Sequence, residues 1–352
     1  VEHSQRTEHP LKRQPDGRFE RISWDEAIGE IAQKLVAIRD QHSPRSIALC
    51  GIGGQANHMD GPFGLSWLGA VGSKIWFNAL AQEKTQHFLV NQWMFDLPPS
   101  AWFEPDHEAA DLLLVLGTNP RISNRGPNPN DTFRELAEDP NRRAIVVDPR
   151  ETETTRQADR HLVVKPGSDA YLLLGMAALI ANTEGLADAG FIAERTRDFE
   201  ALRAALSEVD VDEMARRCGL SREALEQTAS EFAAADRASI MQDLAVEHLP
   251  FSTLISYLIR VLCALTGNVA KQGSNRFVQT GSPLSWNPAR FDEPVRTLHA
   301  GIQGVAAMGG FPMISPTLAP EEILQDHPER IRAMVVEGAN PFLSFSDTSR
   351  WR

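Results

Sequence analysis

Cysteine is scarce in this sequence, and its three cysteines are far apart. Cys50, Cys218 and Cys263 form no CxxC pair in a chain of 352 residues. We therefore expect no zinc site or iron–sulfur cluster with cysteine ligands within this chain. Cys50 and Cys263 lie in apolar stretches, which predicts small buried side chains in a reducing compartment.

Long apolar runs and clustered positive charge are missing as well. No stretch approaches the roughly 18 apolar residues of a membrane-spanning helix, so we expect no membrane span. The net charge is −12 and the isoelectric point is near 5.4, which argues against nucleic acid as a partner. The opening VEHSQRTEHP is no signal peptide. We expect a cytoplasmic protein, although the sequence has no initiator methionine, and a missing start would also remove any targeting signal.

What the sequence does contain is an alternation of apolar strand-like segments with helix-like segments. This alternation predicts the α/β class, with mostly parallel sheets covered by helices on both faces. The run ADLLLVLGTNP (110–120) is continuously apolar before its glycine, which is typical of a strand buried on both faces. Ser23 followed by Glu26 predicts a helix start. We expect helices at 24–40, 60–71, 82–95, 130–138, from 169, within 185–235 and at 251–269; strands at 46–50, near 74–80, and at 110–116, 143–148, 161–164, 238–246 and 330–337; and a long irregular loop over 273–316.

Two distant strands end in the same way. LLLVLGTNP and AMVVEGANP each carry a glycine, one further residue and then Asn-Pro after an apolar strand. Repeated structural logic of this kind suggests two related units. We expect two doubly wound, mostly parallel-sheet domains, one inserted in the other, with the strands at 46–50 and 332–336 in one sheet. The expected boundaries give residues 1–108 with 271–352 as one discontinuous domain and residues 109–270 as the inserted domain.

Polar residues at the expected strand ends suit a nucleotide. Gly117 permits close approach of a ligand, Asn119 offers a donor and an acceptor, and Asp148 can accept hydrogen bonds from ribose hydroxyls. Arg150 supplies a cation for a phosphate, and Asp169 can either cap a helix or bind a ring amine. The alternative, that all five are turn and cap residues, fits the spacing equally well. There is no GxGxxG or GxxxxGK[ST] motif, which argues against ordinary NAD or ATP binding.

Longer stretches make the sequence recognisable. The pattern DPR-x-T-x-T, then AD-x-H, then a PG-[ST]-D turn occurs in AIVVDPRETETTRQADRHLVVKPGSD. HPLKRQPDGRFERISWDEAIGEIAQKL, ADLLLVLGTNP, LCALTGNVAKQGSN and VVEGANP complete the set in order along nearly the whole chain. The chain resembles the molybdopterin oxidoreductases of the dimethyl sulfoxide reductase and formate dehydrogenase class.

The resemblance implies a cofactor and the residues that hold it. In that family two molybdopterin guanine dinucleotides hold one molybdenum or tungsten, each gripped by one α/β domain. Carried onto this chain, Asp148 binds the ribose or guanine of one dinucleotide and Asp169 reads its guanine amino group. The full cofactor-binding set is Gly117, Thr118, Asn119, Asp148, Arg150, Thr154, Gly167, Ser168 and Asp169, with Gly338, Asn340 and Pro341 as the equivalent strand end in the other domain.

The position of the protein ligand to the metal departs from the family pattern. The corresponding stretch here is FNALAQEKTQHF, which puts Gln82 or Glu83 where relatives carry Cys, selenocysteine, Ser or Asp. Three interpretations stay open: an ordinary helix start, Glu83 as an oxygen ligand to the metal, or a metal held by the pterins alone. His87 can carry protons near neutral pH, or it can serve packing alone.

The function implied by the resemblance is a molybdopterin-dependent oxidoreductase that moves an oxygen atom, or a hydride and electrons, on a small-molecule substrate. An electron-transfer partner subunit is a further expectation. The alternative is a non-catalytic member similar to the large iron–sulfur subunit of complex I. Relatives of the catalytic type begin with a cysteine-rich module for an iron–sulfur cluster and end with a domain that closes over the pterins. This sequence has neither, so we expect a portion of a larger enzyme that is inactive alone.

Overall fold

The chain divides into two compact units. In this computed structural model, residues 6–51, 61–97, 101–126, 128–279, 295–306 and 312–351 are described. The first unit combines Val1–Gln82 with Leu284–Arg352, and Glu83–Pro283 forms the second unit. The domain boundaries expected from the sequence lie elsewhere, at 108/109 and 270/271, because residues 83–108 and 271–279 belong with the middle unit in the structure.

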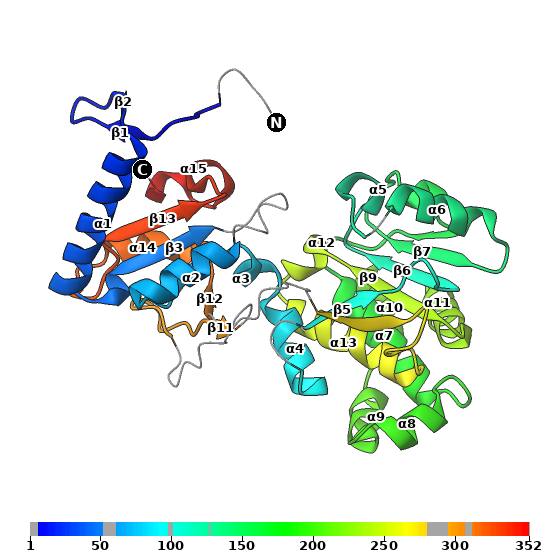
Figure 1. The fold of residues 1–352 in the computed structure, drawn as a ribbon. Coiled ribbons are helices and arrows are strands. Elements are labelled where there is room, and N and C mark those ends of the chain that lie inside the picture. Colours follow the sequence, from blue (N-terminus) through cyan, green and yellow to red (C-terminus); the bar gives the residue numbers. More distant parts are fainter. Residues whose placement is uncertain are drawn as a thin grey trace. The chain divides into compact units, whose positions relative to one another are not determined.

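The first unit is built on a five-stranded sheet with the strand order β11-β12-β4-β3-β13. Figure 1 labels β3, β11, β12 and β13 in this unit. Four of these strands run parallel, and β11 is antiparallel to β12. β3 and β13 pair in register from Ile47 and Ala333 onward, so two segments almost 300 residues apart share one sheet, as expected. The elements are β1 (Leu11–Arg13), β2 (Phe19–Arg21), α1 (Trp24–Gln41), η1 (Pro44–Ser46), β3 (Ile47–Gly51), α2 (Gly61–Val71), β4 (Ile75–Phe77), α3 (Leu80–Glu83), β11 (Val305–Ala306), β12 (Pro312–Ile314), η5 (Pro316–Leu318), α14 (Ala319–Leu324), β13 (Ala333–Glu337), α15 (Pro341–Ser344) and η6 (Thr348–Trp351).

The second unit contains a four-stranded, fully parallel sheet with the order β8-β7-β6-β9. A separate antiparallel pair joins β5 to β10. The elements are α4 (Thr85–Phe95), β5 (Ala101–Pro105), β6 (Leu112–Leu116), α5 (Pro120–Ser123), α6 (Pro129–Glu138), β7 (Arg143–Val147), η3 (Thr155–Gln157), β8 (Arg160–Leu162), α7 (Asp169–Asn182), α8 (Ala189–Arg195), α9 (Phe199–Ser207), α10 (Val211–Cys218), α11 (Arg222–Ala234), β9 (Ala238–Gln242), α12 (Leu244–Glu247), α13 (Ser252–Leu265) and β10 (Asn275–Gln279).

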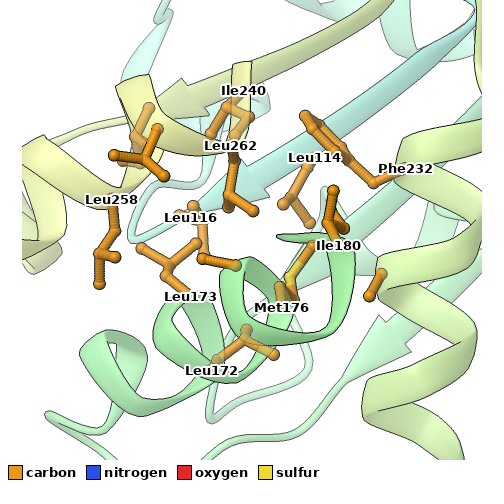
Figure 2. Close-up of a cluster of buried hydrophobic side chains, with 14 of the residues drawn as sticks. Leu114, Leu116, Leu172, Leu173, Met176, Ile180, Phe232, Ile240, Leu258 and Leu262 are labelled. Atoms are coloured by element: carbon orange, nitrogen blue, oxygen red, sulfur yellow. The ribbon is translucent and has the colours of Figure 1, made fainter. Parts of the chain in front are cut away.

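Strand β6 shows why the second sheet is buried on both faces. Its five residues are all buried, and successive side chains of a strand point to opposite faces. Leu114 packs in the cluster that holds Met176 of α7 and Leu262 of α13 (Figure 2). Leu113 joins the cluster that holds Phe133 of α6 on the other face. The continuous apolar run therefore predicted the strand correctly, and burial of each such side chain contributes about 1.5–3 kcal/mol.

Several expected elements differ from the structure. The segment 238–246 is not one strand, because β9 ends at Gln242 and the helical turn α12 follows. The segment 273–316 is not simply irregular, since β10, β11 and β12 fall within its described residues. These strands are short and pair with segments far away in the sequence, so local hydrophobic patterning carries little signal for them. Helix α1 begins as predicted, with Ser23 Oγ accepting the N–H of Glu26 at 3.1 Å.

Candidate functional site

The end of β6 forms a tight turn into α5. Gly117 has a φ of +64°, in the left-handed region that glycine adopts without strain. Asn119 precedes α5, and its carbonyl oxygen accepts the N–H groups of Ile122 and Ser123, both at 2.9 Å. Pro120 stands at the first position of this helix, where its missing N–H is not needed.

The end of β13 in the first unit repeats this turn. Gly338 has a φ of +59°, and Asn340 has a φ of −122° against −116° at Asn119. The carbonyl oxygen of Asn340 accepts the N–H groups of Leu343 at 3.0 Å and Ser344 at 2.8 Å. Pro341 opens α15, as Pro120 opens α5. The repeated Gly-x-Asn-Pro pattern therefore encodes the same local structure in both units, as the sequence suggested.

Around the β6 turn, a second loop is fastened to Asn119. Thr154 is buried, and its Oγ1 donates to Asn119 Oδ1 at 2.7 Å. The other end of the same amide, Nδ2, donates to Glu153 Oε2 at 2.7 Å. Because both the oxygen and the nitrogen of the amide form hydrogen bonds, the side chain of Asn119 joins the loop that follows β7 (residues 148–154) to the end of β6. Arg150 lies on that loop and is exposed, and Thr118 is buried.

Two carboxylates lie at the same edge of the second sheet. Asp148 follows β7, and its Oδ1 accepts the N–H of Arg150 at 2.8 Å. Asp169 is the first residue of α7 and is only 7% exposed. Burial raises the pKa of the Asp169 carboxyl, and the nearby charge of Asp148 raises it further. The two acids are thus close enough for the charge of Asp148 to act on the Asp169 carboxyl.

The turn before α7 holds Asp169 in place. Gly167 has a φ of +78°, and Ser168 precedes the helix with its Oγ donating to the carbonyl oxygen of Lys165 at 2.6 Å. Ser168 makes no capping bond to the helix, and the Asp169 carboxylate has no side-chain partner among the residues described. The backbone N–H of Asp169 itself acts on this carboxylate and lowers its pKa against the effect of burial. Because a buried carboxylate is costly unless its oxygens are hydrogen-bonded, this edge suits a ligand that supplies further N–H groups.

Gly117 packs directly against the backbone of α12, with no room for a side chain. A Cβ at this position would lie 2.8 Å from the backbone nitrogen of Val246 and 3.2 Å from Cβ of Ala245. The N–H of Ala245 also donates to the carbonyl oxygen of Gly117 at 3.1 Å. The glycine therefore allows α12 to pack against the end of β6, which is a different reason from the ligand approach considered from the sequence.

The candidate metal-facing segment lies at the junction of α3 and α4. Gln82 is exposed and Glu83 is half-buried. Burial raises the pKa of Glu83, while the charges of Lys84 and His248 act in the opposite direction. Within the described part of the chain, no three His, Cys, Asp or Glu side chains gather so as to hold a metal ion.

His87 is a buried residue of α4. Its Nε2 accepts the N–H of Phe103 at 2.9 Å, and Nδ1 lies 3.2 Å from the side-chain amide of Gln242. Burial lowers the pKa of His87 well below its ordinary value, and the charge of Arg260 lowers it further. This geometry favours the packing role, the second of the two roles that the sequence left open.

A chain of alternating charges, which the sequence did not reveal, lies beside this segment. We call Glu104–Arg125–Asp243–Lys84–Glu247 the ion-pair chain. Burial raises the pKa of Glu247 to about 7, against the opposing effect of Lys84. The one available signal was the polar pair at 242–243, which interrupts an apolar stretch after a strand. The partners themselves come from four separate segments, since Asp243 and Glu247 both belong to α12 and its N-cap, and they are brought together only by the fold.

A family model described as molybdopterin oxidoreductase matches residues 6–349. The chain belongs to the molybdopterin oxidoreductase family. The resemblance seen in the DPR and PGSD motifs is thus confirmed over nearly the full sequence. Membership of this family implies a cofactor built on molybdopterin, with molybdenum or tungsten.

Formate dehydrogenases and nitrate reductases are among the proteins similar to this chain. Formate dehydrogenase H of Escherichia coli is 27% identical over 317 residues, covering 87% of this chain and 40% of that protein. The assimilatory nitrate reductase catalytic subunit of Bacillus subtilis is 27% identical over 285 residues, covering 79% of this chain and 39% of that protein. The chain therefore spans about 40% of the length of these relatives.

The fold agrees with a solved structure of the same class. Acetylene hydratase from Pelobacter acetylenicus matches with a TM-score of 0.77 and 20% sequence identity, over 99% of this chain and 51% of that one. The predicted α/β fold class is thereby confirmed. Among the helices in the described part of the chain, none is both long and apolar enough to cross a membrane.

Proposed function

We propose that the protein containing this chain is a molybdenum- or tungsten-dependent oxidoreductase that transfers an oxygen atom, or a hydride with electrons, on a small substrate. Its support is family membership together with relatives named as formate dehydrogenase and nitrate reductase. These relatives also argue against a non-catalytic member similar to the complex I subunit. The cytoplasmic location and an electron-transfer partner subunit stay predictions.

The cofactor form proposed is the bis(molybdopterin guanine dinucleotide). The observation that carries it is the Asp148–Asp169 edge, where a buried carboxylate has no side-chain partner among the residues described. The N1–H and amino group of guanine are donors that suit the remaining acceptor positions of the Asp169 carboxylate, and ribose hydroxyls suit Asp148. When bound, the cofactor would supply the redox chemistry of its metal. The residues of this chain bind and orient it.

The two turns would serve the two dinucleotides. Thr118, Asn119 and Thr154 line the end of β6, and Gly338, Asn340 and Pro341 form the matching end of β13. Glu83 is proposed as the oxygen ligand to the metal, with Gln82 beside it as the other candidate. His87 is proposed as a support for this segment rather than a proton carrier.

The test uses the full-length protein as purified. We expect molybdenum or tungsten by elemental analysis, and guanine nucleotide on denaturation. Asp148→Ala and Asp169→Ala should each lose hydrogen bonds worth about 1–3 kcal/mol, which lowers cofactor affinity by about one to two orders of magnitude. Asp210→Ala is the matched control, because Asp210 caps α10 by accepting the N–H of Glu213 at 3.0 Å.

Two results would contradict the proposal in different ways. Absence of both metal and guanine nucleotide from the wild-type protein would favour a scaffold without cofactor. Full occupancy in the Asp148 and Asp169 variants, with only a lowered melting temperature like that of the control, would reject the guanosine assignment. In that case the acids are turn and helix-start residues, as the second interpretation of the sequence held.

A further inference from the structure

Lys84 directly follows Glu83 and is almost completely enclosed. Its side chain is 8% exposed, and its Nζ lies 3.2 Å from Asp243 Oδ1 and in contact with a carboxylate oxygen of Glu247. The ring centroid of Trp102 lies 5.9 Å from the same nitrogen. A buried ammonium is tolerated only with such partners, so the lysine side chain has one well-defined position.

Both carboxylates that hold Lys84 belong to α12 or its first flanking residue. Asp243 precedes α12 and Glu247 is its last residue. Gln86 adds a second tie, because its Nε2 donates to the backbone carbonyl of Glu83 and lies 3.4 Å from that of Glu247. The segment around Glu83 is therefore held against α12 by the ion pairs of Lys84 and by the side chain of Gln86.

Helix α12 is in turn fastened to the end of β6. The N–H of Asp243 donates to the carbonyl oxygen of Leu116 at 3.3 Å, and that of Ala245 to Gly117 at 3.1 Å. The missing side chain of Gly117 leaves room for the backbone of Val246. Asp243 also lies 3.6 Å from Arg125, on the loop beyond α5. One short helical turn thus contacts both candidate segments.

We propose that Lys84 is a positioning residue that sets the place of Glu83 relative to the end of β6. This inference rests on the proposed function, in which Glu83 faces the metal and the end of β6 holds a dinucleotide. Lys84 acts by geometry: its ion pairs with Asp243 and Glu247 fix the α3–α4 junction to α12. A buried ion pair contributes little net stability compared with apolar residues of similar size, so positional accuracy is what its removal would cost.

The decisive variant is Lys84→Met combined with Glu247→Met, studied in the full-length protein purified with its cofactor. It replaces Lys84 and Glu247 by two apolar side chains of similar length, which avoids the unpaired Glu247 carboxylate that Lys84→Met alone would leave. Asp243 also loses Lys84 but keeps Arg125, 3.6 Å away, as its ion-pair partner. We expect an almost unchanged melting temperature and an unchanged content of metal and guanine nucleotide. Amide hydrogen exchange over residues 80–90 should become roughly tenfold faster, as expected for a lost local constraint.

A spectroscopic readout separates positioning from structure alone. The X-ray absorption fine structure of the metal should change in the double variant, because Glu83 is no longer held in place. Arg222→Met is the control, since among the described residues Arg222 pairs only with the exposed Asp212 and Glu226, and it should change neither readout. Unchanged hydrogen exchange over 80–90 would overturn the proposal, and so would faster exchange with an unchanged metal spectrum.

The metal content of the wild-type protein tests the proposed function independently of the role of Lys84. A wild-type protein without metal would reject the function itself. Hydrogen exchange over residues 80–90 would still decide whether Lys84 fixes this segment, because that measurement needs no cofactor. Faster exchange would support the fastening to α12, and unchanged exchange would overturn it.

Discussion

The ends of β6 and β13 have the same turn but different surroundings. Both follow Gly-x-Asn-Pro, and their asparagine φ angles differ by only a few degrees. At β6 the asparagine amide is engaged by Thr154 and Glu153. At β13 the side chain of Asn340 has no hydrogen-bond partner among the residues described.

The strands β6 and β13 also differ in how deeply they are buried. β6 is a central strand with all five residues buried, whereas β13 is an edge strand of the described sheet and contains no fully buried residue. A short motif therefore determines the turn, while the neighbouring segments determine which side chains surround it. The acids Asp148 and Asp169 come from two such neighbouring segments, after β7 and β8.

The largest expected change in stability tests whether close packing against α12 constrains the turn at the end of β6. Gly117→Ala places a methyl group 2.8 Å from the backbone of Val246. We expect a loss of about 1 kcal/mol from the positive φ and a further loss of about 1–3 kcal/mol from the forced contact. Gly167→Ala is the matched control, with a φ of +78° and its nearest atom 3.8 Å away.

Urea unfolding of the two glycine variants gives the measurement. The control should lose only the part due to the positive φ, about 1 kcal/mol. Equal losses in the two variants would show that the contact with α12 is easily relieved. The turn at Gly117 would then be no more constrained than the turn at Gly167, and the difference between the ends of β6 and β13 would be smaller.

A smaller effect compares the two asparagines directly. Asn119→Ala leaves the buried hydroxyl of Thr154 without its acceptor, which costs about 1–3 kcal/mol. Asn340→Ala removes an exposed side chain and should change stability by less than about 0.5 kcal/mol. Melting temperatures of the cofactor-free proteins check this prediction. Equal losses would mean that both turns are braced by their side chains.

Apart from the pairing of β3 with β13, the sequence predicted what depends on local patterning and missed what depends on distant contacts. The buried strand 112–116, the start of α1 at Ser23 and both Asn-Pro turns follow from nearby residues. Helix α12 and the pairing of β5 with β10 do not. The ion-pair chain joins Glu104 to Glu247, and neither residue stands out in its own segment. Because the burial that makes such a chain important arises only on folding, no spacing rule could find it.

The smallest expected effect contrasts one carboxylate from each unit. Burial raises the pKa of Asp169 in the second unit, so the folded protein binds this proton more tightly than the unfolded chain does. Stability therefore falls as the pH rises from the ordinary aspartate pKa through the raised one. Lys12 and Lys34 lower the pKa of Glu30 in the first unit to about 2, so its contribution is present above the ordinary pKa of 4.5 and is lost as the pH falls through about 2.

Asp169→Asn and Glu30→Gln should therefore remove opposite slopes from the urea midpoint of the cofactor-free protein between pH 2 and 7. Guanosine monophosphate sharpens the contrast. Its N–H donors favour the ionised form of Asp169, so in the wild-type protein and in Glu30→Gln the nucleotide should move the fall in stability to lower pH. In Asp169→Asn it should have no such effect. A nucleotide effect that persists without the Asp169 carboxylate would place the guanine elsewhere and leave Asp169 as a residue of the helix start.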